Sequence, residues 1–217
     1  FPDRSSLGAS LLFILMNCIP LIMAAVFSLV LSEVNSLGEF FKKVFLQKES
    51  SLSWILAFFI PVIYYGISIL LMNVRFTGNS LLAFFLYFPW TLLYGGLEEV
   101  GWRWFLQDHL SFSKHFIFKM MVLSLVWFLW HIPIYQLPWI TAGSSNYLIF
   151  YLMILGNTFL FGALKEYSKG AVPCILSHML IDSLAVLMLV QSSLPQIILL
   201  VIIEILVSSW LVASRKL

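Results

Sequence analysis

The sequence predicts an all-α integral membrane protein, a polytopic transmembrane helical bundle, from its composition, its long apolar runs and the placement of its charges. Of its 217 residues, 61% are hydrophobic and 10% are charged, whereas a soluble domain has about 45–50% and about 25%. The net charge of +2 is too small to indicate nucleic acid as a partner. Both cysteines lie inside apolar runs, so no disulfide framework is expected.

The membrane spans follow from the length of the apolar runs, because a hydrocarbon core of about 30 Å requires roughly 20 apolar residues per helix. Seven segments satisfy this requirement: 8–32, 52–74, 80–104, 117–137, 147–164, 171–191 and 195–213. The connecting segments are short and polar, and no internal repeat is visible. Residues 1–217 are therefore expected to form a single integral-membrane domain. Because the chain begins with Phe1, we expect a missing N-terminal piece with one further helix, which would make eight spans.

The orientation follows from the positive residues, which are retained on the cytoplasmic side of a membrane. One side of the expected bundle carries nine of them and the other side carries two: Lys42, Lys43, Lys48, Lys114, Lys119, Lys165, Lys169, Arg215 and Lys216 against Arg4 and Arg75. This bias places the C-terminus and the segments 33–50, 105–116 and 165–170 in the cytoplasm. The short loops favour a bacterial cytoplasmic membrane.

Ionisable residues inside the expected spans are candidates for function, because each costs about 2.5–3.5 kcal/mol at the middle of a membrane helix. The third span ends with Glu98 and Glu99, which cannot point at the same place because a helix turns about 100° per residue. Arg103 lies four residues after Glu99, at the spacing that pairs a carboxylate with a guanidinium. Glu98 is then left without a partner in its own helix, which makes it a candidate general base. The alternative is that both glutamates only mark the end of the helix.

Histidines on two later spans add to this set. His131 lies deep in the fourth span, either as a catalytic group or as an interhelical hydrogen-bonding group. His178 and Asp182 lie four apart on one face of the sixth span, where the carboxylate can orient the imidazole, or both can face one ion or oxyanion. The alternative is a structural pair that ties helices together. Glu204 in the last span has no second ionisable residue near it in its span, and we interpret it as structural.

Taken in order, these residues resemble the signature of the CAAX prenyl protease and bacteriocin-processing family, the type II CAAX endopeptidases among them. Glu98-Glu99-x-x-x-Arg103 fits the first family motif, and His178-x-x-x-Asp182 is the acidic variant of the third. The second motif reads Trp127-x-x-x-His131, with tryptophan where the family usually has phenylalanine. The resemblance covers about residues 90–190, the expected protease-like core.

The resemblance implies an intramembrane endopeptidase that hydrolyses small or lipidated peptides or proteins near the cytoplasmic face. Glu98 would activate water, His131 would position it, and Glu99 and Arg103 would complete the catalytic set. His178 and Asp182 would stabilise the oxyanion. Since an ionised aspartate cannot donate a hydrogen bond, the acid at 182 must be protonated, orient His178 or bind a cation. Zinc is therefore retained as an alternative, with Glu98, His131, His178 and Asp182 as its ligands.

Two other classes of function compete with the peptidase. One is a non-catalytic bacteriocin-immunity protein or scaffold that binds a peptide or a membrane protein. The other is a proton- or ion-coupled transporter, which the same buried acids would serve but for which no repeated halves are visible. Under the peptidase reading, the partners are the lipid bilayer and a peptide substrate, prenylated or bacteriocin-like.

Overall fold

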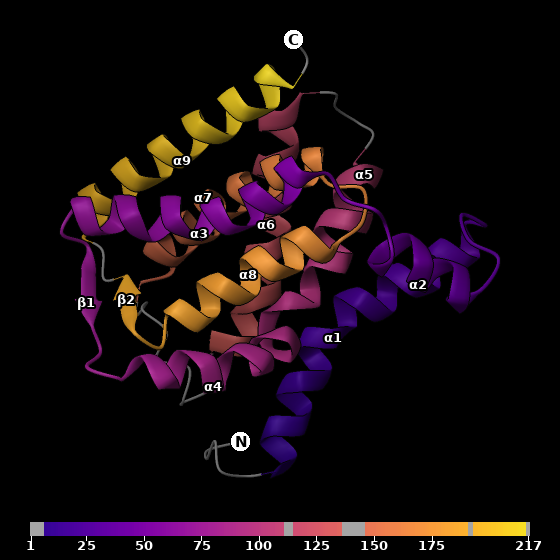
Figure 1. Cartoon of the computed structure of the whole chain (residues 1–217), viewed down its shortest axis with the longest axis horizontal. Coiled ribbons are helices and arrows are strands. Elements are labelled where there is room, and N and C mark those ends of the chain that lie inside the picture. The colour runs from indigo at the N-terminus through magenta and orange to yellow at the C-terminus, as the bar shows by residue number, and fades with distance from the viewer. Residues whose placement is uncertain (1–6, 111–114, 136–145, 191–192, 216–217) are drawn as a thin grey trace.

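The computed structural model describes residues 7–110, 115–135, 146–190 and 193–215, and the statements below refer to these residues. The described chain is helical apart from one pair of short strands (Figure 1). In chain order, the elements are α1 (Leu7–Val30), α2 (Leu37–Phe45), α3 (Ser51–Leu70), β1 (Val74–Phe76), α4 (Leu81–Thr91), the π-helices η1 (Leu92–Gly96) and η2 (Val100–Leu106), α5 (Gln107–His109), α6 (Phe116–Tyr135), α7 (Tyr147–Tyr167), α8 (Val172–Leu184), β2 (Met188–Val190) and α9 (Leu194–Ser214).

The predicted polytopic helical bundle is confirmed, but seven spans are not. Five described helices are long and apolar enough to cross a membrane: α1, α3, α6, α7 and α9. A sixth span is formed if α4 and η1 continue into η2 and α5 across a bend of 48°. The expected span 171–191 is instead the 13-residue helix α8 followed by a turn and β2. At about 1.5 Å per residue, α8 is too short to cross a hydrocarbon core.

Polar side chains begin several of the helices. Ser36, Ser50 and Asn146 accept hydrogen bonds from main-chain N–H groups in the first turns of α2, α3 and α7. Ser193 and Gln196 close the first turn of α9 in a capping box. These caps satisfy N–H groups that have no partner within a helix, and they explain why apolar runs begin as helices where they do.

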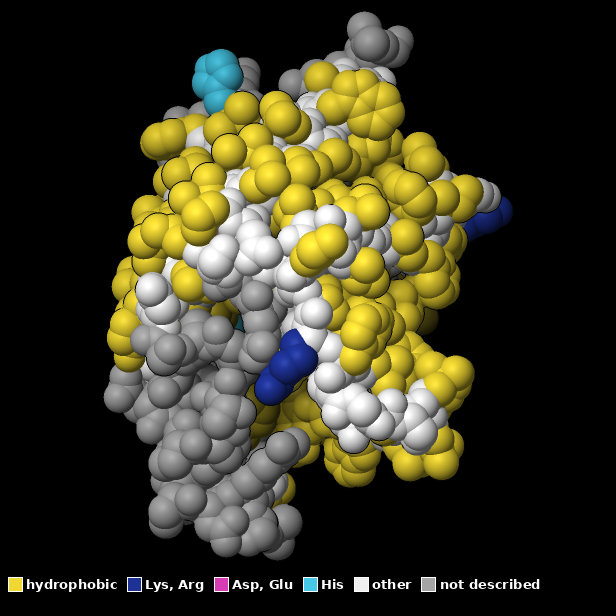
Figure 2. Space-filling view, turned by 90° about the vertical axis from the view of Figure 1, so that its left-hand side faces the viewer, with side chains coloured by type: hydrophobic (Ala, Val, Ile, Leu, Met, Phe, Trp, Pro, Cys, Tyr) yellow, Lys and Arg dark blue, Asp and Glu magenta, His cyan; other side chains and the backbone are white. Residues whose placement is uncertain are grey.

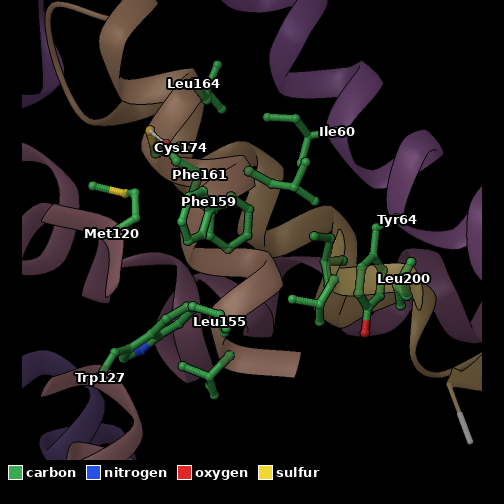
Figure 3. Packing of buried hydrophobic residues seen from close by; sticks show 14 of the residues in the cluster. Ile60, Tyr64, Met120, Trp127, Leu155, Phe159, Phe161, Leu164, Cys174 and Leu200 are labelled. Atoms are coloured by element: carbon green, nitrogen blue, oxygen red, sulfur yellow. Dashed lines mark hydrogen bonds between the residues drawn. The ribbon is translucent and has the colours of Figure 1, made fainter. Parts of the chain in front are cut away.

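The core is built around α7, which packs against α3, α6, α8 and α9. Figure 3 shows Phe159 and Phe161 of α7 among side chains of the surrounding helices, such as Ile60 of α3 and Met120 of α6. Large apolar side chains also cover the outside of the bundle, and Trp210 is 67% exposed. Apolar surface this extensive does not suit water, and it fits helices that face lipid.

The lysine-rich segments meet at one end of the bundle. The Val44 carbonyl of α2 accepts a hydrogen bond from Ala171, Glu49 accepts from the N–H groups of Lys169 and Gly170, and Lys165 pairs with Asp108 at 2.9 Å. The described basic residues of this end are Lys42, Lys43, Lys48, Lys119, Lys165, Lys169 and Arg215, while Lys114, Lys216 and Arg4 lie outside the described residues.

The opposite end of the bundle carries a two-stranded antiparallel ribbon, at the left of Figure 1. The ribbon pairs Val74 with Val190, Arg75 with Leu189 and Phe76 with Met188. It joins the segment after α3 to the segment after α8. The sequence analysis did not predict it, because β2 falls inside an apolar run that was expected to continue as a helix.

Candidate active site

The two adjacent glutamates lie between two π-helices. The N–H of Leu97 donates to the Leu92 carbonyl five residues earlier, at 3.0 Å, as expected of a π-helical turn. Gly95 and Gly96 lie in η1, and Gly101 lies in η2 against the main chain of Pro20 in α1. Glycine leaves room for these close approaches, and the wider turns replace the regular helix assumed from the sequence. Even so, Glu98 and Glu99 have different surroundings, as predicted.

Glu98 is 1% exposed and is held by two indole groups. Trp102 Nε1 and Trp127 Nε1 both donate to its Oε2 atom, at 3.0 and 3.1 Å. The expectation that Glu98 lacks a partner in its own helix is therefore wrong, because Trp102 lies four residues further along. Both indoles bind the same oxygen.

Glu99 forms the predicted pair with Arg103 and also contacts the third motif. Its Oε2 accepts from Arg103 Nε at 3.0 Å, and both side chains are fully buried. Its Oε1 lies 2.8 Å from Nδ1 of His178. The guanidinium of Arg103 also lies over the Trp127 ring, 5.0 Å from the ring centre. Glu99 thus links the first motif to α8.

His131 has one ring nitrogen engaged by its own helix. Nδ1 lies 2.8 Å from the carbonyl of Trp127, and since a carbonyl only accepts, this nitrogen carries the proton. In the neutral ring, Nε2 is then an acceptor. His131 also lines a cavity, so this acceptor is suited to hold a water molecule there.

His178 lies between two carboxylates. The Glu99 carboxylate accepts a hydrogen bond from Nδ1 of His178. Asp182 Oδ2 lies 3.6 Å from Nε2 of His178, a distance longer than a hydrogen bond. The His178 ring stacks on Phe161 with centroids 5.2 Å apart. A Cβ atom on Gly95 would lie 2.5 Å from Asp182 Oδ2 and 2.9 Å from His178 Nε2. Glycine at position 95 therefore allows η1 to approach this pair.

These groups meet at a cavity of about 280 Å³ in the membrane-embedded part of the bundle. The cavity is lined by Glu98, His131, His178 and Asp182. Glu99 and Arg103 are not among its lining residues. The rest of the lining is mostly aromatic and aliphatic, from α1, α3, η1, α7 and β2. An apolar cavity with a few converging polar groups is typical of a ligand or active site.

The cavity lies toward the β1–β2 end of the bundle. His131 is 15 residues from the start of α6 and four from its end, and α6 starts at the lysine-rich end, where Lys119 reaches the Gln107 carbonyl. On α3 the lining residues Tyr64 and Tyr65 follow the middle of the helix, and Val190 of β2 also lines the cavity. The lining thus extends from the middle of the bundle to the β1–β2 end, whereas His178 is only six residues from the start of α8, which begins at the lysine-rich end.

The zinc alternative does not fit this arrangement. Within the part of the chain that the structure describes, no three or more His, Cys, Asp or Glu side chains are placed to hold a metal ion. Trp102 and Trp127 already donate to one carboxylate oxygen of Glu98. No chemical step is therefore derived through a metal.

The sequence analysis missed several residues of the cavity. Asn157 of α7 lines it, and its buried Oδ1 has no hydrogen-bond partner among the described residues. Asn17 of α1 and Tyr65 of α3 also line it. Asn17 and Asn157 could have been predicted as cavity residues, because each is a polar residue within an apolar run. Nothing in the sequence indicated Tyr65.

Glu204 lies away from the cavity lining. It is 1% exposed, its Oε1 has no hydrogen-bond partner among the described residues, and it packs directly against Gly156 of α7. Cys18 and Cys174 are free thiols. The position of Glu204 agrees with its structural interpretation.

The match to a known family covers the elements that carry the three motifs. Residues 79–184, from α4 through α8, match the family model described as type II CAAX prenyl endopeptidase Rce1-like. All seven residues of the three motifs lie inside this range. No curated protein matches the chain. The match implies a peptidase in a membrane. Over this range the chain is therefore similar to the Rce1-like type II CAAX prenyl endopeptidases.

Proposed function

We propose that this protein is an intramembrane endopeptidase that hydrolyses small or lipidated peptides with a glutamate-activated water. The observation that carries the proposal is the convergence of Glu98, His131, His178 and Asp182 on one apolar cavity. The four side chains come from three separate segments of the matched region. The family match, which concerns peptidases, supports the same reading.

In the proposed mechanism, Glu98 is the general base and His131 orients the water through Nε2. The water oxygen bonds to the carbonyl carbon of the substrate while its proton passes to Glu98. The carbonyl oxygen becomes an oxyanion, to which the imidazolium form of His178 donates from Nε2. The carbon–nitrogen bond then breaks, and Glu98 returns the proton to the leaving amine. Base catalysis of this kind contributes typically 10²–10⁴-fold to the rate.

Glu99, Arg103 and Asp182 are positioning residues in this scheme. Glu99 fixes the His178 ring through Nδ1, and Arg103 holds Glu99. Asp182 faces Nε2 of His178, where its charge compensates that of the imidazolium. This assigns Asp182 the orienting role among the alternatives left open by the sequence.

The first test compares wild-type protein with Glu98→Gln in liposomes. The probes are a farnesylated peptide ending in Cys-Val-Ile-Ala, with a fluorophore and a quencher on either side of the bond after cysteine, and a proteome-derived peptide library read by mass spectrometry. Wild type is expected to cleave, and Glu98→Gln is expected to lose at least 100-fold in kcat/KM. Glu204→Gln is the matched control, because this buried glutamate does not line the cavity.

Four outcomes separate the alternatives. Cleavage that resists a zinc chelator and requires Glu98 supports the proposal, whereas loss with the chelator assigns the chemistry to a metal. Absence of cleavage of both probes by wild type, together with a cellular phenotype that survives Glu98→Ala, would leave the immunity or scaffold function. Equal cleavage by wild type and Glu98→Gln contradicts the assigned base.

A further inference from the structure

The ribbon β1–β2 borders the cavity with one edge of β2. Leu189 and Val190 both line the cavity, although consecutive side chains of a strand point to opposite faces. Two neighbours can border one cavity when the edge of the strand faces it. β1 covers the other edge, so the edge facing the cavity is the one that β1 leaves uncovered.

The register shows which main-chain groups lie on this edge. The Thr77 N–H donates to the Leu187 carbonyl at 2.9 Å, two steps along the ladder from the pair Arg75–Leu189. Hydrogen-bonded and non-hydrogen-bonded pairs alternate in an antiparallel ladder, so Leu189 points its N–H and carbonyl toward β1. The main-chain groups of Met188 and Val190 point away from β1.

These groups lack a partner in the described part of the chain. Outside the ribbon, no hydrogen bond between described residues reaches the main chain of Met188 or Val190. Val190 is only 7% exposed. An N–H or carbonyl group that is buried without a partner is unfavourable, so a ligand that pairs with this edge stabilises it.

The ribbon is held firmly enough to act as a template. Thr77 Oγ1 and Asn79 Nδ2 donate to the Val186 carbonyl, at 2.6 and 2.9 Å. Gln196 at the start of α9 donates to the Leu71 carbonyl at 2.9 Å. Both strands are thus fastened to neighbouring segments. Figure 2, which looks onto this end, shows a basic side chain near the centre of the view, among hydrophobic side chains.

We propose that the peptide substrate binds in an extended conformation as a third strand along the uncovered edge of β2. This inference rests on the proposed function. Exposed strand edges bind peptides through main-chain hydrogen bonds, and a third strand would lie about 4.8 Å from β2. The peptide would then run through the cavity that Glu98 and His178 line. Recognition would depend on the peptide main chain more than on one side-chain sequence.

The first test changes the substrate and leaves the protein intact. Single N-methyl groups are placed on successive amides of the farnesylated probe, or of the library peptide that wild type cleaves fastest. Because N–H groups alternate sides along a strand, methylation is expected to lower kcat/KM about tenfold or more at every second amide. The amides between them should tolerate it. A flat or non-alternating profile overturns the proposal.

The second test changes the edge of β2. Val190→Pro removes the N–H that faces the cavity and is expected to lower kcat/KM about tenfold, mainly through KM. Val190→Ala keeps the N–H and measures the effect of the lost side chain, so Val190→Pro should fall about tenfold below Val190→Ala. Phe76→Pro is the matched ribbon control, because Phe76 also belongs to a non-hydrogen-bonded pair of the ladder but its N–H points to the outer edge of β1. This control should stay within about threefold of wild type.

The outcomes distinguish failure of this inference from failure of the proposed function. If wild type cleaves neither probe, the peptidase itself is contradicted, and the inference falls with it. If wild type cleaves but N-methylation shows no alternation, the peptidase stands and the third strand is wrong. A Val190→Pro variant with altered oligomeric state and normal cleavage would assign the edge to a second copy of the chain, which also overturns the inference.

Discussion

Trp127 is the residue where this chain departs from its family motif, and the structure gives the indole a specific role. Its N–H donates to Glu98 at 3.1 Å, its ring lies under the Arg103 guanidinium, and it packs against His131 and His178. A phenylalanine could keep the ring contacts but could not donate the hydrogen bond. Tryptophan therefore adds a restraint on the proposed base.

The substitution Trp127→Phe is expected to lower kcat about tenfold and to lower the Tm as well. The physical reason is the loss of one hydrogen bond to a buried charged group, which is worth about 1.5–3 kcal/mol. Trp130→Phe is the control, because the indole N–H of Trp130 has no partner among the described residues. Equal activity in Trp127→Phe and wild type would show that this hydrogen bond does not serve catalysis.

The pair of Glu99 and Arg103 makes a prediction about stability. Both side chains are fully buried, and removing one partner of a buried ion pair costs about 3–5 kcal/mol. Arg103→Leu should therefore lower the Tm strongly in detergent, and the double variant Glu99→Gln/Arg103→Leu should recover part of the loss. A double variant that is no more stable than the single one would contradict the assigned charge pairing.

At the scale of elements, the long helices could be predicted from the sequence, whereas the early end of α8 and the strand β2 could not. The apolar runs of α1, α3, α6, α7 and α9 each fill a bilayer, and hydropathy alone locates them. Hydropathy does not distinguish side chains that face lipid from those that face a cavity, so the run through α8 and β2 read as one span. The pairing of Glu99 with Arg103 followed from local spacing. The contacts of Trp127 and β2 depend on segments distant in sequence, which spacing cannot supply.

Helix η1 makes a close approach to α8 at Gly95. Gly95→Ala would place its Cβ within 2.9 Å of His178 Nε2 and closer still to Asp182, so one of them must move. Cleavage is expected to fall at least tenfold, and the Tm should change less than in Arg103→Leu. Gly66→Ala is the control, because a Cβ there meets nothing within 4 Å. Full activity in Gly95→Ala would mean that the spacing between η1 and α8 does not matter.

Helices α7 and α9 meet at another glycine. A Cβ on Gly156 would overlap the carboxylate of Glu204, so Gly156→Ala should lower the Tm. The double variant Gly156→Ala/Glu204→Ala removes the obstructing carboxylate and should restore much of the stability. If the second substitution gives no recovery, the clash is not the cause of the loss.

At the scale of the whole molecule, the charges and the cavity lie toward opposite ends. Seven described basic residues gather at the end with α2, and Arg75 lies at the ribbon end. If the lysine-rich end faces the cytoplasm, the ribbon and the part of the cavity that β2 lines face the other side of the membrane.

Labelling with a membrane-impermeant maleimide tests this orientation in a variant without Cys18 and Cys174. Arg75→Cys is expected to react in intact cells. Lys48→Cys, at the lysine-rich end, should react only after the cells are permeabilised. The reverse pattern would place the ribbon in the cytoplasm and contradict the orientation drawn from the positive residues.

The early end of α8 has a consequence for the hydration of the bundle. A helix of 13 residues spans about 20 Å, so the chain leaves helical structure at a depth where lipid would surround a full span. Irregular main chain at such depth is stable only against protein or beside a water-filled space, and here Ala185 and β2 border the cavity. The early end of the helix that carries His178 and Asp182 therefore predicts a hydrated cavity beside them. Water, the second reactant of the proposed hydrolysis, would then already be present at the site.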